Sequence, residues 1–130
     1  MKYAILIYHN PASRQVWERL SDAERTEGLG VYAALNEDLV ASGELIVTEA
    51  LADPTQAKRV SVHEGQAITT DGPFAEVKEH LAGFYLIECD SMERALEVAA
   101  RVPEAALRPP LAPEHGLIEV RPVMDYNIGP

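Results

Sequence analysis

The sequence predicts an α+β domain of the ferredoxin-like kind, a split βαβ arrangement with an inserted hairpin. Two observations predict it. Segments with strand and helix patterns follow one another as strand, helix, strand, hairpin, strand, helix and strand. The chain has 130 residues, of which 47% are hydrophobic, and this suits one ordinary core without a linker. Residues 1–130 are therefore predicted to form a single domain.

The first half of the chain predicts a strand, a long helix and a second strand. The range 2–8, KYAILIY, is short, apolar and rich in β-branched and aromatic residues, with a proline-containing break behind it. Ser21 and Glu24 then have the spacing of a capping box, and Gly43 is a typical helix stop. A helix of about 20 residues is expected between them. The range 44–51, ELIVTEAL, is the second predicted strand.

The second half predicts a hairpin followed by another strand, helix and strand. Glu64 and Gly65 form the turn between two β-type runs, and Ser91 has the position of a helix cap. The Pro-rich range 103–116 is expected to be a loop. The predicted elements are a hairpin over 57–72, a strand over 81–89, a helix over 91–102 and a last strand over 117–124.

The central strands predict that both faces of the sheet are covered. The ranges 3–8 and 83–89 are apolar at consecutive positions, and consecutive side chains of a strand point to opposite faces. Two helices cover only one face of such a sheet. A second copy covers the other most simply, because a two-fold interface uses one apolar patch twice. We therefore expect a homodimer.

Composition excludes several classes of partner. The formal net charge is −10, with 21 acidic against 11 basic residues and no Lys/Arg cluster, so nucleic-acid binding is not expected. No run approaches the about 18 apolar residues of a membrane span, and no membrane partner is expected. The single cysteine, Cys89, cannot pair within its own chain. A reducing compartment, and so a cytoplasmic location, is the prediction.

Four segments carry a resemblance to a known family. They are DGPFAEVKE (71–79), GFYLIEC (83–89), AARVP (99–103) and IEVRPVM (118–124). Together they resemble the YCII-related family, in particular its branch named for a DGPFAETKE motif. The resemblance implies a ferredoxin-like protomer in a dimeric α+β barrel, usually bacterial. Val77 stands where the motif has threonine, and the 103–116 loop is longer than is usual in the family.

The segment 70–80, TDGPFAEVKEH, admits two interpretations. In the structural one, Asp71 and Gly72 make a turn, and Phe74 packs into the core. In the functional one, the rigid turn holds acid/base groups at the edge of a pocket. The candidate catalytic residues there are Asp71, Glu76 and Lys78, with Asp71 as the acid and Lys78 keeping Glu76 ionised. Phe74 and Glu79 are then candidate ligand-binding residues.

Further polar candidates lie at strand ends. His9 follows the first strand, either as a proton shuttle and fourth catalytic candidate or as an exposed loop histidine. Tyr8, Glu49 and Arg121 are candidate ligand-binding residues, although core or rim packing explains them too. Some relatives in the wider family have a His–Asp pair in the first-helix region, where this chain has Tyr32, so that assignment is not transferred.

No metal or cofactor is predicted. The four histidines lack the spacing of a metal site, and the chain has neither a Gly-rich phosphate loop nor a nucleophilic serine elbow.

Two functions are open at this point, and the sequence does not decide whether the protein is an enzyme. The first is a small-molecule-binding protein that acts without a cofactor, by acid/base chemistry, on a carbonyl-bearing or aromatic substrate. The second is a non-catalytic ligand-sensing or regulatory module. The resemblance adds a candidate partner for it, because relatives of this branch are often linked with extracytoplasmic-function sigma factors.

Overall fold

The computed structural model describes residues 1–74 and 77–125. Its elements are β1 (Lys2–His9), α1 (Pro11–Arg19), α2 (Asp22–Ser42), β2 (Leu45–Ala50), the 3₁₀ helix η1 (Pro54–Gln56), β3 (Lys58–His63), β4 (Gln66–Asp71), β5 (His80–Glu88), α3 (Met92–Ala99), the 3₁₀ helix η2 (Pro103–Ala106) and β6 (Ile118–Pro122).

The main sheet has four strands in the order β2-β5-β1-β6, and all neighbouring strands are antiparallel. Each outer strand is joined to a central one through helices, β1 to β2 and β5 to β6, so the two β-α-β elements interleave. Strands β3 and β4 form a separate two-stranded sheet. The predicted α+β class is confirmed, with a sheet of β-α-β elements and a distinct hairpin.

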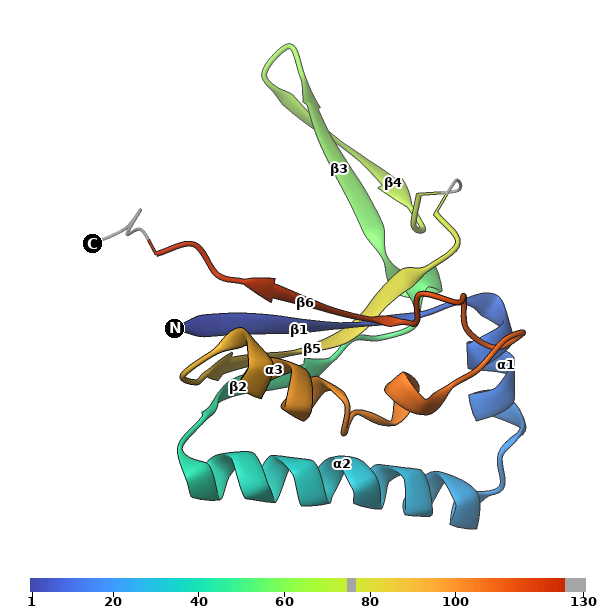
Figure 1. The fold of residues 1–130 in the computed structure, drawn as a ribbon. Helices are drawn as coiled ribbons and strands as arrows, with labels where there is room; N and C mark the ends of the chain where they lie inside the picture. Colours follow the sequence, from blue (N-terminus) through green and yellow to red (C-terminus); the bar gives the residue numbers. More distant parts are fainter. Residues whose placement is uncertain (75–76, 126–130) are drawn as a thin grey trace.

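The helices α2 and α3 lie on the same side of the main sheet (Figure 1). Side chains at alternate positions of β1 and β5 point toward them and are buried, as strand geometry requires. The core combines these side chains with buried residues of the helices: Tyr3, Ile5, Ile7, Tyr85 and Ile87 from the sheet, Leu35 and Leu39 from α2, and Ala95 and Val98 from α3.

Helix α2 begins and ends as predicted. The Ser21 hydroxyl accepts from the backbone N–H of Glu24 at 3.1 Å, the Glu24 carboxylate accepts from the Ser21 N–H at 2.9 Å, and Gly43 ends the helix in the left-handed region. The last helix is shorter than predicted: α3 ends at Ala99, and the loop behind it contains η2.

One helix was not predicted. The break after β1 is the start of α1, where Asn10 is the cap and Pro11 is the first residue. The Asn10 side chain accepts from the Ser13 N–H at 2.8 Å and donates to the Leu111 carbonyl at 3.1 Å. Proline is favoured at this position because its missing N–H has no helical partner anyway. The first strand does end before Pro11, as predicted, but the helix that begins there was missed.

No helix of the described residues lies over the opposite face of the main sheet, and the hairpin β3–β4 rises on that side (Figure 1). Ala4, Leu6, Phe84 and Leu86 alternate with the core residues and are half-buried. In the two hairpin strands Arg59 is half-buried, and the other residues are exposed. Among the described residues, no helix is long and apolar enough to cross a membrane.

Candidate functional site

A cavity of about 560 Å³ opens at one end of the main sheet, on its helix side. Strands β1, β2 and β5, helices α1 and α2, and η2 all contribute to its wall. Ile7, Trp17, Leu29 and Leu51 are among its apolar residues. Its polar residues include His9, Arg14, Tyr32, Glu49, His80 and Glu104. A concave, mostly apolar space with a few polar groups is the usual form of a small-molecule site.

The cavity contains a hydrogen-bonded imidazole–carboxylate pair. His9, the last residue of β1, places Nε2 2.9 Å from Oε2 of Glu104 in η2. The Glu104 side chain is 12% exposed and that of His9 is 26% exposed. The 3₁₀ turn of η2, begun by Pro103, carries this carboxylate over the end of the sheet. Residues 95 positions apart in the chain thus form one unit.

Tyr32 of α2 completes this unit. Its hydroxyl donates to Oε1 of Glu104, so the two carboxylate oxygens have different partners. Burial, together with the neighbouring carboxylate, raises the pKa of Tyr32 well above its ordinary value, and the hydroxyl keeps its proton. For Glu104 burial raises the pKa, but the hydrogen bonds from His9 and Tyr32 outweigh burial and leave the pKa below its ordinary value. Glu104 is therefore a carboxylate at neutral pH.

A second imidazole lies beside the first. His80 opens β5 and is the direct cross-strand partner of His9 on β1. Directly opposed residues of an antiparallel pair place their side chains on the same face, with Cβ atoms about 5 Å apart. The Arg14 guanidinium of α1 donates to Nδ1 of His80 at 3.3 Å. The cavity thus holds two adjacent imidazoles with different partners, a carboxylate for His9 and a guanidinium for His80.

The model of the YCII-related domain matches residues 1–127. An uncharacterized protein of Rhizobium meliloti (strain 1021) is 35% identical over 129 residues, which cover 99% of this chain and 97% of that protein. The chain belongs to the YCII-related family. Within the described part of this YCII-related protein, no group of three or more His, Cys, Asp or Glu side chains is arranged to hold a metal ion.

The sequence-predicted residues of this YCII-related protein are divided among several places. His9 and Glu49 line the cavity. Tyr8 and Glu79 line a second, smaller hollow of about 370 Å³, where the Tyr8 hydroxyl donates to Glu119 at 3.3 Å. Arg121 is exposed on β6. Glu49 and Arg121 form no ion pair with each other.

The DGPF segment lies apart from the cavity. Asp71 is the end of β4, its side chain is 88% exposed, and its carboxylate pairs with the Lys58 ammonium across the hairpin at 2.6 Å. Lys78 is exposed as well. Glu76 lies outside the described residues. Neither Asp71 nor Lys78 contributes to the cavity wall.

The expectation that Phe74 packs into the core was wrong. Phe74 is 59% exposed, and its ring stacks with the guanidinium of Arg59, 4.6 Å from the ring centroid. A cation–π contact with a hairpin side chain stabilises the turn locally without burying the ring. The turn itself is as predicted, because Gly72 has a φ of +82° and its N–H donates to the Ala57 carbonyl at 2.7 Å.

Sequence reasoning missed Arg14, His80 and Glu104, and it assigned no role to Tyr32. Arg14 lies on the unpredicted helix α1, which Asn10 and Pro11 signal. The other residues come together only through the register of β1 with β5 and the path of η2, and neither has a sequence signature.

Proposed function

We propose that this protein is a cofactor-independent enzyme that moves a proton on a small carbonyl-bearing molecule held in the cavity. The observation that carries the proposal is the 2.9 Å contact of His9 with Glu104 inside that cavity. An imidazole oriented by a carboxylate is a frequent arrangement for general acid/base catalysis near neutral pH. His9, predicted from the sequence as a catalytic candidate, is the base in this proposal.

Glu104 and Tyr32 fix the state of the base. Because Glu104 is ionised, it accepts the Nε2–H of His9, and neutral His9 then has its lone pair on Nδ1. Nδ1 takes the proton from a carbon next to the substrate carbonyl, an enolate forms, and the resulting imidazolium is stabilised by Glu104. Tyr32 holds the second carboxylate oxygen and so limits rotation of Glu104. Glu104 and Tyr32 are positioning residues, whereas Asp71, Glu76 and Lys78 remain candidates from the sequence alone.

Hydrogen–deuterium exchange at carbon tests this proposal without a known substrate. Cyclohexanone, phenylacetone and phenylpyruvate are incubated with the protein in D₂O at several pH values, and loss of the α-proton signal is followed by NMR. We expect at least one compound to exchange faster than in buffer, and His9→Gln to lower the enzymatic rate by about 10²-fold or more. The matched control is His63→Gln, because His63 is exposed on the hairpin and lies outside the cavity wall.

Two results contradict the acid/base proposal. One is exchange of the whole panel at the buffer rate, and the other is equal exchange by wild type and His9→Gln. A co-purifying molecule seen by native mass spectrometry, combined with no exchange, favours the alternative of a non-catalytic ligand-sensing module. For that alternative the sigma-factor association suggested by the DGPF branch stays a prediction, to be tested by binding to the purified sigma factor.

The open sheet face supports a proposal for assembly. Leu6, Phe84 and Leu86 present half-buried apolar side chains on a face with no helix over it, and the hairpin stands beside this face (Figure 1). We propose that two protomers pack these faces together as a dimeric α+β barrel of the DGPF branch. Sedimentation is expected to show a dimer at micromolar concentration, and Leu6→Glu to shift it toward monomer. A wild-type monomer under these conditions contradicts the barrel.

A further inference from the structure

Arg14 is a cation in the wall of the cavity that forms no ion pair with a carboxylate of the described residues. It is half-buried on α1 and contributes to the cavity. None of the ion pairs formed by the described residues involves it, and its side-chain hydrogen bond there is the one to His80. A guanidinium presents five N–H donors, so most of its donors are left for a ligand or water. The capped start of α1 fixes the helix that carries it.

His80 orients Arg14 in the cavity wall. Arginine only donates, so Nδ1 of His80 accepts one hydrogen bond from the guanidinium, at 3.3 Å. Nε2 of His80 is buried and has no hydrogen-bond partner among the described residues. Because this atom is closed to solvent, a ligand in the cavity meets the remaining N–H groups of Arg14 and not Nε2 of His80. An oxygen with more than one lone pair suits these guanidinium donors.

One acidic group of the cavity wall, that of Asp53, has hydrogen-bond partners of its own. Asp53 precedes η1, and its Oδ1 accepts from both the backbone N–H of Thr55 at 2.9 Å and the Thr55 hydroxyl at 2.8 Å. Its pKa is lowered mainly by those Thr55 hydrogen bonds and only to a smaller extent by the charge of Arg14. Asp53 is thus engaged locally, and it affects Arg14 only through longer-range attraction.

The rest of the wall favours an apolar ligand body and disfavours more than one negative charge. Trp17 lies on α1 near Arg14, and Arg25 of α2 both stacks on its ring, 5.8 Å from the centroid, and donates to its carbonyl at 3.0 Å. Leu29 and Leu51 add aliphatic surface. Glu18, Glu49, Asp53 and Glu104 also line the cavity and repel negative charge. An anionic group is therefore favoured only in direct contact with Arg14, and a phosphate dianion is repelled more strongly than a carboxylate.

We infer that the cavity binds a small carboxylic acid with an apolar or aromatic body, its carboxylate held by the guanidinium of Arg14. This inference rests on the proposed function for the role of the site, and it adds the substrate class. Because Arg14 is hydrogen-bonded to His80, the cross-strand neighbour of His9, a carboxylate on Arg14 places the adjoining carbon skeleton near His9. The substrate is then an acid that also bears a carbonyl group.

Binding of simple acids tests the inference separately from catalysis. Phenylacetate, its neutral amide phenylacetamide and the dianionic phenyl phosphate are titrated into the protein at pH 7.5 by calorimetry. We expect phenylacetate to bind about tenfold or more tightly than either analogue, the difference typical of a charge-assisted hydrogen-bonded pair. His9→Gln is expected to keep this preference, so the result does not depend on whether the exchange assay succeeds.

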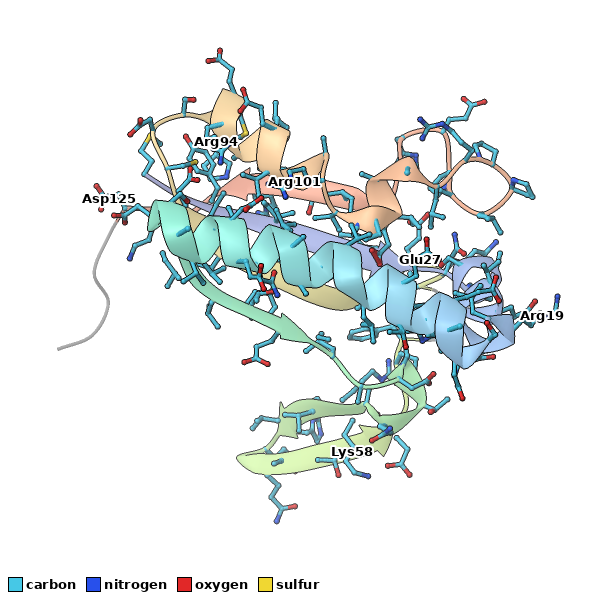
Figure 2. All side chains as sticks on the ribbon, turned by 90° about the horizontal axis from the view of Figure 1, so that it is seen from below. Arg19, Glu27, Lys58, Arg94, Arg101 and Asp125 are labelled. Carbon is cyan, nitrogen blue, oxygen red and sulfur yellow. The ribbon has the colours of Figure 1, made fainter. Side chains whose placement is uncertain are left out.

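Arg14→Gln and Arg19→Gln form a matched pair of variants on one helix. Arg19 points outward from the far end of α1 (Figure 2), and it does not line the cavity. Arg14→Gln is expected to weaken phenylacetate binding about tenfold or more, with little change for the amide, while Arg19→Gln binds as wild type. Arg14→Lys is expected to recover part of the affinity, because it restores the charge without the planar fork.

Three results overturn the inference: no binding of phenylacetate, equal binding of phenylacetate and phenylacetamide, or the same loss in Arg14→Gln and Arg19→Gln. Circular dichroism reports whether each variant is folded. If Arg14→Gln does not fold, the comparison of the acid with the amide on wild-type protein still decides the question.

Discussion

Two carboxylates of this protein pair with nitrogen bases in opposite surroundings. Glu104 pairs with His9 at 2.9 Å in the cavity, with its side chain 12% exposed and a second bond from Tyr32. Asp71 pairs with Lys58 at 2.6 Å on the projecting hairpin, with its side chain 88% exposed (Lys58 is labelled in Figure 2). The shorter of the two contacts, Asp71–Lys58, is therefore the more exposed one.

The comparison shows why distance alone is a poor guide to function. An exposed ion pair is screened by water and salt and contributes about 0–1 kcal/mol, because two long side chains must be ordered to form it. A buried carboxylate with two hydrogen bonds has one orientation and one protonation state, and both are required for catalysis. The DGPF segment carries the motif that suggested the DGPF branch, whereas the cavity has the geometry for chemistry.

The largest expected effect is that of Gly83→Ala, at the cavity end of β5. A Cβ at Gly83 would lie 2.9 Å from the backbone carbonyl oxygen of Glu49, and this backbone atom cannot move without shifting β2. We expect a loss of about 2–3 kcal/mol in the free energy of unfolding, measured by urea denaturation. A free energy of unfolding equal to that of wild type would contradict this prediction and would mean that β2 moves away from β5 at little cost.

Glu104→Gln should have the next largest effect, through the cavity carboxylate. The free energy of unfolding of the variant is expected to be about 1–2 kcal/mol lower at pH 7, because the hydrogen bond from His9 to a charged carboxylate is lost. The pKa of Glu104 is lower in the folded than in the unfolded protein, so its contribution is full above the unfolded value of about 4.5. It is lost as pH falls through the folded value. The difference between the urea midpoints of the two proteins should therefore shrink as the pH falls below about 4.5, and a constant difference at all pH values would contradict this.

At the DGPF turn, Gly72→Ala should have a smaller effect than Gly83→Ala. Gly72 has a φ of +82°, but a Cβ there would meet no other atom within 4 Å. Only backbone strain is added, and a loss of about 1 kcal/mol is expected from thermal denaturation. A loss as large as that of Gly83→Ala would mean that the turn is packed more tightly than in the single protomer.

The smallest effect should come from Asp71→Asn, the exposed counterpart of Glu104→Gln. The variant removes the charge that pairs with Lys58 and keeps the shape of the side chain. Unfolding free energy is expected to change by at most about 0.5 kcal/mol, and less in 0.5 M salt. Loss of proton exchange in Asp71→Asn would move the acid/base site to the hairpin and reverse the comparison.

Much of the fold was predictable because its signals are local. The capping box of Ser21 and Glu24, the stop at Gly43 and the Glu64–Gly65 turn each depend on residues close in the chain. The start of α1 is local as well, but Asn10 and Pro11 were interpreted only as the break after the first strand, and the cap signal of Asn10 was not considered.

The candidate site was predictable only in part, because it is not local. His9 was identified from its place at a strand end, and Glu49 likewise. Glu104 and His80 reach His9 through the chain path of η2 and the register of β1 with β5. No spacing rule in a single sequence encodes such contacts. Phe74 shows the converse error, since an aromatic residue beside a rigid turn was assigned to the core and instead stacks on Arg59 in solvent.

The central claim, that ligands bind beside His9 and not at the DGPF turn, is tested most directly by mapping a ligand on the protein. Phenylacetate is titrated into ¹⁵N-labelled protein, and backbone amide shifts are followed by NMR. The account predicts saturating shifts at Ala50, Ala82 and Gly83, which line the cavity, and none at Thr69 or Thr70 on the exposed strand β4. Shifts concentrated at Thr69 and Thr70, with Ala82 and Gly83 unchanged, would contradict it.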